Sequence, residues 1–221
     1  MHYLDRRRVR PIDDALRASV LEDLPELADV RDEELRRKCI GAWAMALAET
    51  SFARITDIPG EATPGVFALK RGSQAVHLRS VARIAVHIAD DFAAEYPEAV
   101  VSRDIVLAGA LLHDIGKAWE FEPENLRRWG ADKSQGGFPS LRHPVYGAHL
   151  CIAAGLPEEI AHIALGHSYE GDLMERSLEC LIVHRADHLW WSIAGGFGLL
   201  KPESAGQLQG RKITPRALRT S

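Results

Sequence analysis

The stretch Leu111-Leu112-His113-Asp114-Ile115-Gly116-Lys117 places a histidine and an aspartate side by side at the end of an apolar run. That run, residues 105–112, has no polar face, which is typical of a helix buried on all sides. An ionised carboxylate in such surroundings is costly unless a partner compensates its charge. A metal ion is the usual partner for adjacent His and Asp side chains, so His113 and Asp114 predict a metal site.

Length and composition indicate an ordinary globular protein. The chain has 221 residues, of which 46% are hydrophobic and 26% charged, so it can bury a core without disulfides. A net charge of -4 argues against stable nucleic-acid binding. Cys39, Cys151 and Cys180 are far apart in the sequence and lack CxxC spacing, which predicts buried, reduced thiols.

Neither terminus nor interior carries a membrane signal. The first residues are not followed by the apolar region of a signal peptide, and the longest apolar runs are shorter than the ~20 residues that span a bilayer. We therefore expect a cytoplasmic protein that makes no membrane contact. The basic run of residues 6–10 could contact phosphate or an acidic partner, or it could simply be solvated.

The hydrophobic pattern around the opening stretch is helical, and no alternating strand pattern accompanies it. Asp32 is a good N-cap, His143-Pro144 suits a helix start, and Gly155 suits a helix end. Helices are expected to begin near Pro11 and to cover 32–53, 73–95, 104–117, 143–154, 156–167 and 173–193. Residues 118–142 read as a long loop. The predicted fold class is all-α.

Three segments follow from this pattern. Residues 1–60 are expected to form an N-terminal helical extension packed on the core, and residues 61–200 to form the domain that carries the metal site. Residues 201–221 form a polar tail with two prolines, which either packs as a strap or stays partly disordered.

Four more side chains of metal-binding type lie at or inside the expected helices, mostly among apolar neighbours. They are His77, His143, His167 and Asp187. Each alone is weak evidence, because a histidine on an apolar helix face is more often a hydrogen-bonded core residue. Their order along the chain and their local contexts carry more weight together.

Five blocks in this order resemble the HD superfamily of metal-dependent phosphohydrolases, in particular its HDIG branch. The blocks are His77 followed by Val81-Ala82, the stretch Leu111 to Lys117, His143-Pro144 with Gly147-Ala148, Leu156-Pro157 with His167, and Asp187 after Leu181-Ile182-Val183. The resemblance covers about residues 73–195. It implies an HD-domain helical bundle, to which residues 1–60 add helices.

The resemblance also implies a binuclear metal centre. A first divalent transition metal would be held by His77, His113, Asp114 and Asp187, and a second by His143 and His167, with Asp114 as the bridging carboxylate. Mixed nitrogen and oxygen ligands suit iron, manganese, cobalt, nickel or zinc, with iron or manganese favoured. A bridging hydroxide would be the nucleophile.

Lys117 is the second candidate catalytic residue beside Asp114. It follows Asp114 by three residues and His113 by four, so on a helix all three would face the same way. Lys117 could contact the substrate phosphate, or it could merely close a helix C-terminus. Two further alternatives stay open. His184 could support a ligand or compete with one, and Arg142 could hold phosphate or be solvated.

The function that the resemblance implies is hydrolysis of a phosphate ester or anhydride on a small substrate, a nucleotide or dinucleotide. A homodimer is compatible with it. Residues 167–172 lack the paired histidines and Gly-Tyr-Pro segment of cyclic-dinucleotide hydrolases, which disfavours that subtype. The alternatives are a di-iron oxygenase that cleaves a carbon bond with dioxygen and a non-catalytic signalling module.

Overall fold

The computed structural model describes residues 10–131 and 139–205, and within these ranges the regular structure is helical. Only isolated β-bridges accompany the helices there. The predicted all-α class is therefore confirmed. None of the helices in these ranges combines the length and hydropathy that a bilayer crossing requires. Cys39, Cys151 and Cys180 are buried and unpaired, as predicted.

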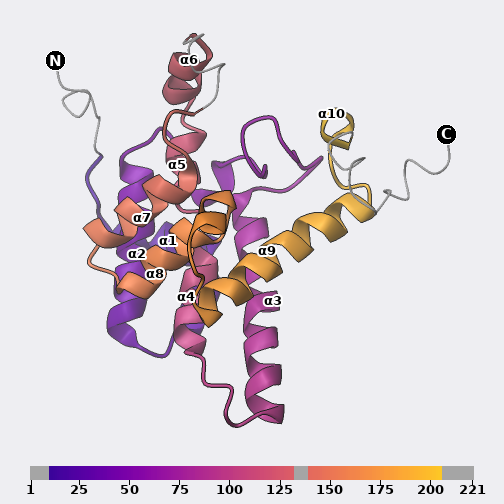
Figure 1. Ribbon diagram of the computed structural model, residues 1–221. Helices are drawn as coiled ribbons and strands as arrows, with labels where there is room; N and C mark the ends of the chain where they lie inside the picture. The colour runs from indigo at the N-terminus through magenta and orange to yellow at the C-terminus, as the bar shows by residue number, and fades with distance from the viewer. Residues whose placement is uncertain (1–9, 132–138, 206–221) are drawn as a thin grey trace.

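The centre of the bundle is helix α4, Arg103–Leu112, which packs against α3 (Gln74–Glu95), α8 (Glu158–Gly166) and α9 (Leu178–Gly196). Ser102 caps its N-terminus by accepting a hydrogen bond from the Ile105 N–H. Every residue from Val106 to Leu112 is buried, as the apolar run predicted. Helices α3 and α4 are antiparallel, and their connection lies at the end of the bundle away from α5 and α6 (Figure 1).

Helix α4 is shorter than expected, because it ends at Leu112 instead of continuing to Lys117. The chain turns at residues 113–116, where the N–H of Lys117 bonds to the Asp114 carbonyl oxygen at 2.9 Å. A short helix, α5 (Lys117–Glu120), follows. His113 and Asp114 therefore lie at the point where the buried helix stops.

Gly116 allows α7 (His143–Ala153) to approach this turn closely. A Cβ atom added at Gly116 would lie 2.1 Å from the His143 carbonyl oxygen and 2.7 Å from the Gly147 nitrogen. Both neighbours are backbone atoms, which cannot rotate away. Gly116 thus brings the start of α7 against the His113–Asp114 turn.

Substitution of Gly116 by alanine should push α7 away from the turn and lower the free energy of unfolding by about 3 kcal/mol. Urea titration monitored by circular dichroism measures this change. Gly130→Ala is the matched control, because nothing lies within 4 Å of a Cβ atom there. A Gly116→Ala protein as stable as the Gly130→Ala protein would contradict the close packing described here.

The N-terminal segment forms a helical layer that shares the hydrophobic core. It contains α1 (Asp14–Asp23), the 3-10 turn η2 (Pro25–Asp29) and α2 (Glu33–Ala48). Asp32 caps α2 as predicted, whereas α1 is capped by Asp13 and α2 ends five residues earlier than expected. The Trp43 indole N–H donates to the Leu111 carbonyl oxygen at 3.0 Å, which ties α2 to α4. The boundary near residue 60 stays a prediction.

The prediction of a loop over residues 118–142 is wrong for much of this segment. Helix α5 is followed by α6 (Pro123–Ala131), whose buried residues are Asn125 and Trp129. Pro123 occupies the first helical position, where proline is tolerated. The basic Lys133 of this segment, like the basic run at 6–9, lies outside the described residues. The last long helix also differs, since it begins at Leu178 after a 3-10 turn, η5 (Tyr169–Leu173), instead of at residue 173.

Residues 59–73 form a folded loop, and its residues Ala68 and Leu69 contact the start of the tail. Leu69 and Leu200 form an isolated bridge, and the Lys201 N–H donates to the Ala68 carbonyl oxygen at 2.7 Å. Residues 201–205, including α10 (Pro202–Ala205), therefore pack on the domain. The rest of the tail, 206–221, lies outside the described residues. Phe67 in this loop has a φ of 51°, a conformation rare for a bulky side chain.

Candidate metal centre

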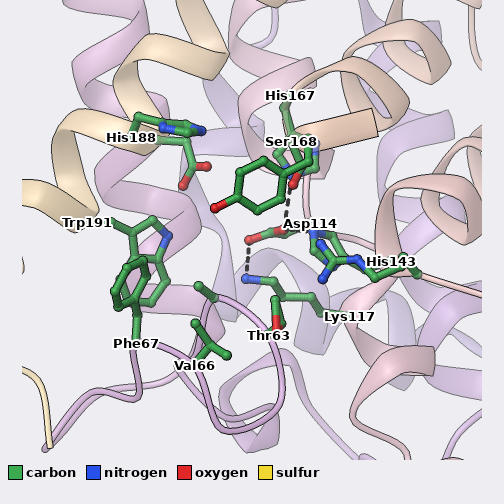
Figure 2. Close-up of a pocket in the computed structure, with 14 residues that line it drawn as sticks. Thr63, Val66, Phe67, Asp114, Lys117, His143, His167, Ser168, His188 and Trp191 are labelled. Carbon is green, nitrogen blue, oxygen red and sulfur yellow. Dashed lines mark ion pairs between the residues drawn. The ribbon is translucent and has the colours of Figure 1, made fainter. Parts of the chain in front are cut away.

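The fold brings all six predicted ligands together from five different elements. His77 comes from α3, His113 and Asp114 from the turn after α4, His143 from the first position of α7, His167 from the C-cap of α8 and Asp187 from α9. All six are at most 8% exposed. In Figure 2, Asp114 lies at the centre of the site, with His167 on one side and Lys117 on the other.

The two carboxylate oxygens of Asp114 face different histidines. Oδ2 lies 3.4 Å from His77 Nε2 and 3.2 Å from His113 Nε2. Oδ1 lies 3.3 Å from His143 Nε2 and 3.4 Å from His167 Nε2. The carboxylate thus stands between two pairs of imidazoles, which is the arrangement required of a bridging ligand.

Asp187 adds a second carboxylate to the Oδ2 side. Its Oδ1 lies 3.1 Å from His77 Nε2 and 3.9 Å from His113 Nε2, and it is a buried oxygen without a hydrogen-bond partner. His77, His113 and Asp187 can each offer one ligand atom within 4.8 Å of the others, as can the group of His113, Asp114 and His167. The donor set of these groups fits a transition metal ion.

The tautomers of three histidines support the same conclusion. The Nδ1 atoms of His113 and His167 contact the carbonyl oxygens of Ala110 and Ala164 at 2.7 and 2.9 Å, and these oxygens can only accept a hydrogen bond. His143 Nδ1 lies 2.6 Å from a Glu120 carboxylate oxygen. In their neutral forms these imidazoles carry the proton on Nδ1 and aim an Nε2 lone pair at Asp114. A metal cation placed between these Nε2 lone pairs and the Asp114 carboxylate would be bound by both.

The charge states agree with metal ligation. Burial would raise the pKa of Asp114, but Lys117 and His113 hold that pKa well below its usual range. For Asp187, burial is likewise outweighed by His77 and His113, and the pKa is lowered. Burial lowers the pKa of His143 despite the opposing effect of Glu120. The site therefore holds ionised carboxylates and, at His143, a neutral imidazole at pH 7, the forms that bind metals.

Lys117 occupies the first position of α5, not a helix C-terminus. It is 1% exposed, and its ammonium group lies 2.7 Å from Asp114 Oδ2 and donates to the Glu61 carbonyl oxygen at 2.7 Å. It also faces the Trp191 ring, 5.8 Å from the centroid. Lys117 thus fastens the 59–73 loop to Asp114, and it lines the pocket described next.

A pocket of about 70 Å³ opens beside the cluster. Asp114, Lys117 and Arg142 contribute charged walls, and Val66, Phe67 and Trp191 contribute an apolar wall. Figure 2 shows Phe67 and Trp191 across the site from His143, with Asp114 and Lys117 between them. Tyr169, from η5, also lines the pocket and is 63% exposed.

Sequence reasoning missed two buried polar residues at the site. Gln74 is fully buried, and its amide nitrogen donates to Asp114 Oδ2 at 2.6 Å. Glu120 is also fully buried and contacts His143. Each lies one helical turn from a predicted site residue, three positions before His77 and three after Lys117, and this spacing is the signal that could have found them.

The remaining histidine alternative is also decided by geometry. His184 Nδ1 contacts the His167 carbonyl oxygen at 2.6 Å, so His184 supports the end of α8. Burial lowers the pKa of His184. His149 and His87 are exposed and are not among the proposed ligands.

Residues 75–190, more than half of the chain, match the family model described as HD domain. A dihydroneopterin 2',3'-cyclic phosphate phosphodiesterase of Methanocaldococcus jannaschii is 30% identical over 174 residues, which make up 76% of this chain and 67% of that protein. No solved structure matches the chain significantly.

The chain therefore belongs to the HD domain family. Within that family it is a metal-dependent phosphohydrolase, as the order of its His and Asp blocks predicted. The family is metal-dependent, and the buried His and Asp groups are able to hold metal.

Proposed function

We propose that this protein hydrolyses a phosphodiester or phosphate ester of a small nucleotide-like molecule at a centre of two divalent transition metals. The observation that carries the proposal is the position of Asp114, whose two oxygens face two separate sets of imidazole nitrogens. A single metal bound on one side of Asp114 would leave the imidazoles on the other side without a cation.

Six residues would hold the two ions. His77, His113, Asp114 and Asp187 would bind the first, and His143, His167 and Asp114 the second. Such a pair supplies positive charge for phosphoryl oxygens and activates water at neutral pH. Iron or manganese is favoured for mixed nitrogen and oxygen ligands.

Lys117 and Arg142 are the groups that would meet the phosphate. Both line the pocket, and both carry side-chain N–H donors that phosphate oxygens can accept. The Arg142 side chain is 22% exposed and is held by Glu170, 3.3 Å from its Nε. Arg142 presents a planar donor set, which suits two phosphate oxygens at once. When substrate binds, the Lys117 ammonium group would exchange part of its contact with Asp114 for a contact with the substrate phosphate.

The size of the pocket constrains the substrate. A volume of about 70 Å³ equals that of about two waters at about 30 Å³ each, which is comparable to the size of one phosphate group. A nucleoside-sized substituent would extend to the pocket mouth, where Tyr169 is exposed and where Phe67 and Trp191 form the apolar wall. The phosphodiesterase relative is named for dihydroneopterin 2',3'-cyclic phosphate, in which a pterin ring takes the place of the nucleoside base.

The experiment that tests the function is a panel assay. The purified protein, loaded with manganese, iron or cobalt, is given nucleoside 2',3'-cyclic phosphates, dihydroneopterin 2',3'-cyclic phosphate, dinucleotides and phosphomonoesters. We expect metal-dependent hydrolysis of at least one cyclic phosphate and its loss on chelation. Oxygen uptake with a substrate and no phosphate ester cleavage would contradict the proposal and favour the di-iron oxygenase alternative.

Tyr169→Ala should raise the KM for a heterocyclic substrate about 10-fold, because a stacked ring contributes roughly 1–3 kcal/mol. The effect on kcat should be small, since Tyr169 lies at the mouth and not at the metals. Steady-state kinetics on a nucleoside cyclic phosphate measures the change, and Tyr169→Phe, which keeps the ring, is the matched control. An equal loss in both variants would contradict a stacking role.

A further inference from the structure

Glu120 is a fully buried carboxylate whose contacts converge on the second half of the proposed metal centre. It is the last residue of α5, and its Oε2 accepts a hydrogen bond from His143 Nδ1 at 2.6 Å. Its Oε1 accepts one from the backbone N–H of His143 at 3.3 Å and lies 3.7 Å from the Arg142 Nε. One carboxylate therefore contacts a proposed ligand, its backbone and a proposed phosphate-binding side chain.

The partner of His143 differs from the partners of the other three histidines. His113 and His167 direct Nδ1 at neutral backbone carbonyl oxygens, and His77 Nδ1 has no hydrogen-bond partner among the described residues. Of these four histidines, only His143 directs Nδ1 at an ionisable group. A carboxylate on the far nitrogen of an imidazole fixes the ring orientation and strengthens the metal-facing nitrogen as a donor.

Glu120 also completes the start of α7. The first N–H groups of a helix have no partner within the helix, and no side chain of the preceding residue caps this one. Glu120 accepts from the N–H of His143, the first helical residue, and places negative charge at the positive end of the helix dipole. The backbone and the ring of His143 are thus held by the same group, and Nε2 is aimed at Asp114 Oδ1 3.3 Å away.

We propose that Glu120 is a positioning residue that sets the affinity of the His143–His167 half of the centre for its metal ion. This inference rests on the proposed two-metal site. Among the described residues, the first half, built on His77, His113 and Asp187, makes no hydrogen bond or ion pair with Glu120, so it should keep its own affinity when Glu120 is replaced. Through Arg142, Glu120 also couples the second half to the group that would hold the substrate phosphate.

The test compares Glu120→Gln, Glu120→Ala and wild type in titrations of metal-free protein with Mn²⁺ alone, followed by calorimetry. Glutamine keeps the shape and an oxygen acceptor but removes the charge, whereas alanine removes both. We expect one of the two Mn²⁺ sites of Glu120→Gln to lose about 10- to 100-fold in affinity, with the other site unchanged. Glu120→Ala should lose more.

Glu170→Gln is the matched control, because Glu170 is the other carboxylate beside Arg142 and has no contact with His143. It should keep both Mn²⁺ affinities. Two sites of wild-type affinity in Glu120→Gln would overturn the inference. Equal weakening of both sites, with a lower Tm of the metal-free protein, would overturn it in favour of a general structural role. A single Mn²⁺ per wild-type chain would instead contradict the two-metal proposal itself.

Discussion

Replacing Asp114 by alanine should remove metal from both halves of the centre and reduce hydrolysis to background. The reason is geometric, because the oxygens of Asp114 lie within 3.4 Å of the Nε2 atoms of all four proposed histidine ligands. In the proposed assignment, each of the other ligands binds only one of the two ions. Metal content after loading with Mn²⁺ and desalting, together with release of product from a cyclic phosphate, measures both losses.

Because Asp114→Ala should also lower stability, a second variant at this position is needed to separate metal loss from unfolding. Lys117 would lose its carboxylate partner in Asp114→Ala and remain buried, which costs stability. Asp114→Asn keeps the shape and an oxygen that accepts from Lys117, so it should fold and still bind little metal. Asp91→Ala, at an exposed acid on α3, is the control for surface charge. Near wild-type metal content in a folded Asp114→Asn or Asp114→Ala protein would refute the site.

Replacing His143 by alanine should give a protein that keeps the first metal and loses the second. Its Nε2 lies 3.3 Å from Asp114 Oδ1, whereas the His77, His113 and Asp187 group does not include it. Activity should fall by about 10³-fold, the upper end of the loss seen when one preorganised electrostatic group is removed from an active site. Quantitative metal analysis should give one Mn²⁺ per chain.

A histidine on the same helix provides the control for this variant. His149 is exposed on α7 and contacts the Tyr146 ring, so His149→Ala should retain two metals and full activity. Complete loss of both ions in a well-folded His143→Ala protein would show that the halves do not bind independently. Retention of two ions would place the second metal elsewhere.

The helical class and the six buried side chains could be predicted because they leave local signals. The apolar run before His113 has the period of a buried helix, and Asp32 and Gly155 mark helix ends by their chemistry. The HDIG blocks add the order in which the ligands occur. Nothing in these signals requires knowledge of which helices touch.

The features that escaped prediction depend on contacts between distant segments. The early end of α4 could not be predicted from Gly116 alone. The need for a glycine there becomes clear only when the backbone of His143 is known to lie against it. Glu120 looks like an ordinary acid in a polar segment, and it becomes a partner of His143 only when α5 and α7 pack together. The sequence of α6 indicates a loop because prolines and glycines within and after it outweigh its short apolar face; they are Pro123, Gly130, Gly136, Gly137 and Pro139.

The apolar wall of the pocket also depends on contacts between distant segments. Phe67 and Trp191 are separated by more than a hundred residues, yet their rings lie 6.2 Å apart and border the pocket. The loop that carries Phe67 holds it in a backbone conformation that few bulky residues adopt, and no local pattern predicts that conformation.

The measurement that tests the central claim most directly is anomalous diffraction from crystals of the Mn²⁺-loaded protein, recorded at the manganese absorption edge. The account predicts two peaks ~3.5–4 Å apart, one on each side of the Asp114 carboxylate. The first should lie near His77, His113 and Asp187, and the second near His143 and His167. A single peak, or two peaks not joined by Asp114, would contradict it.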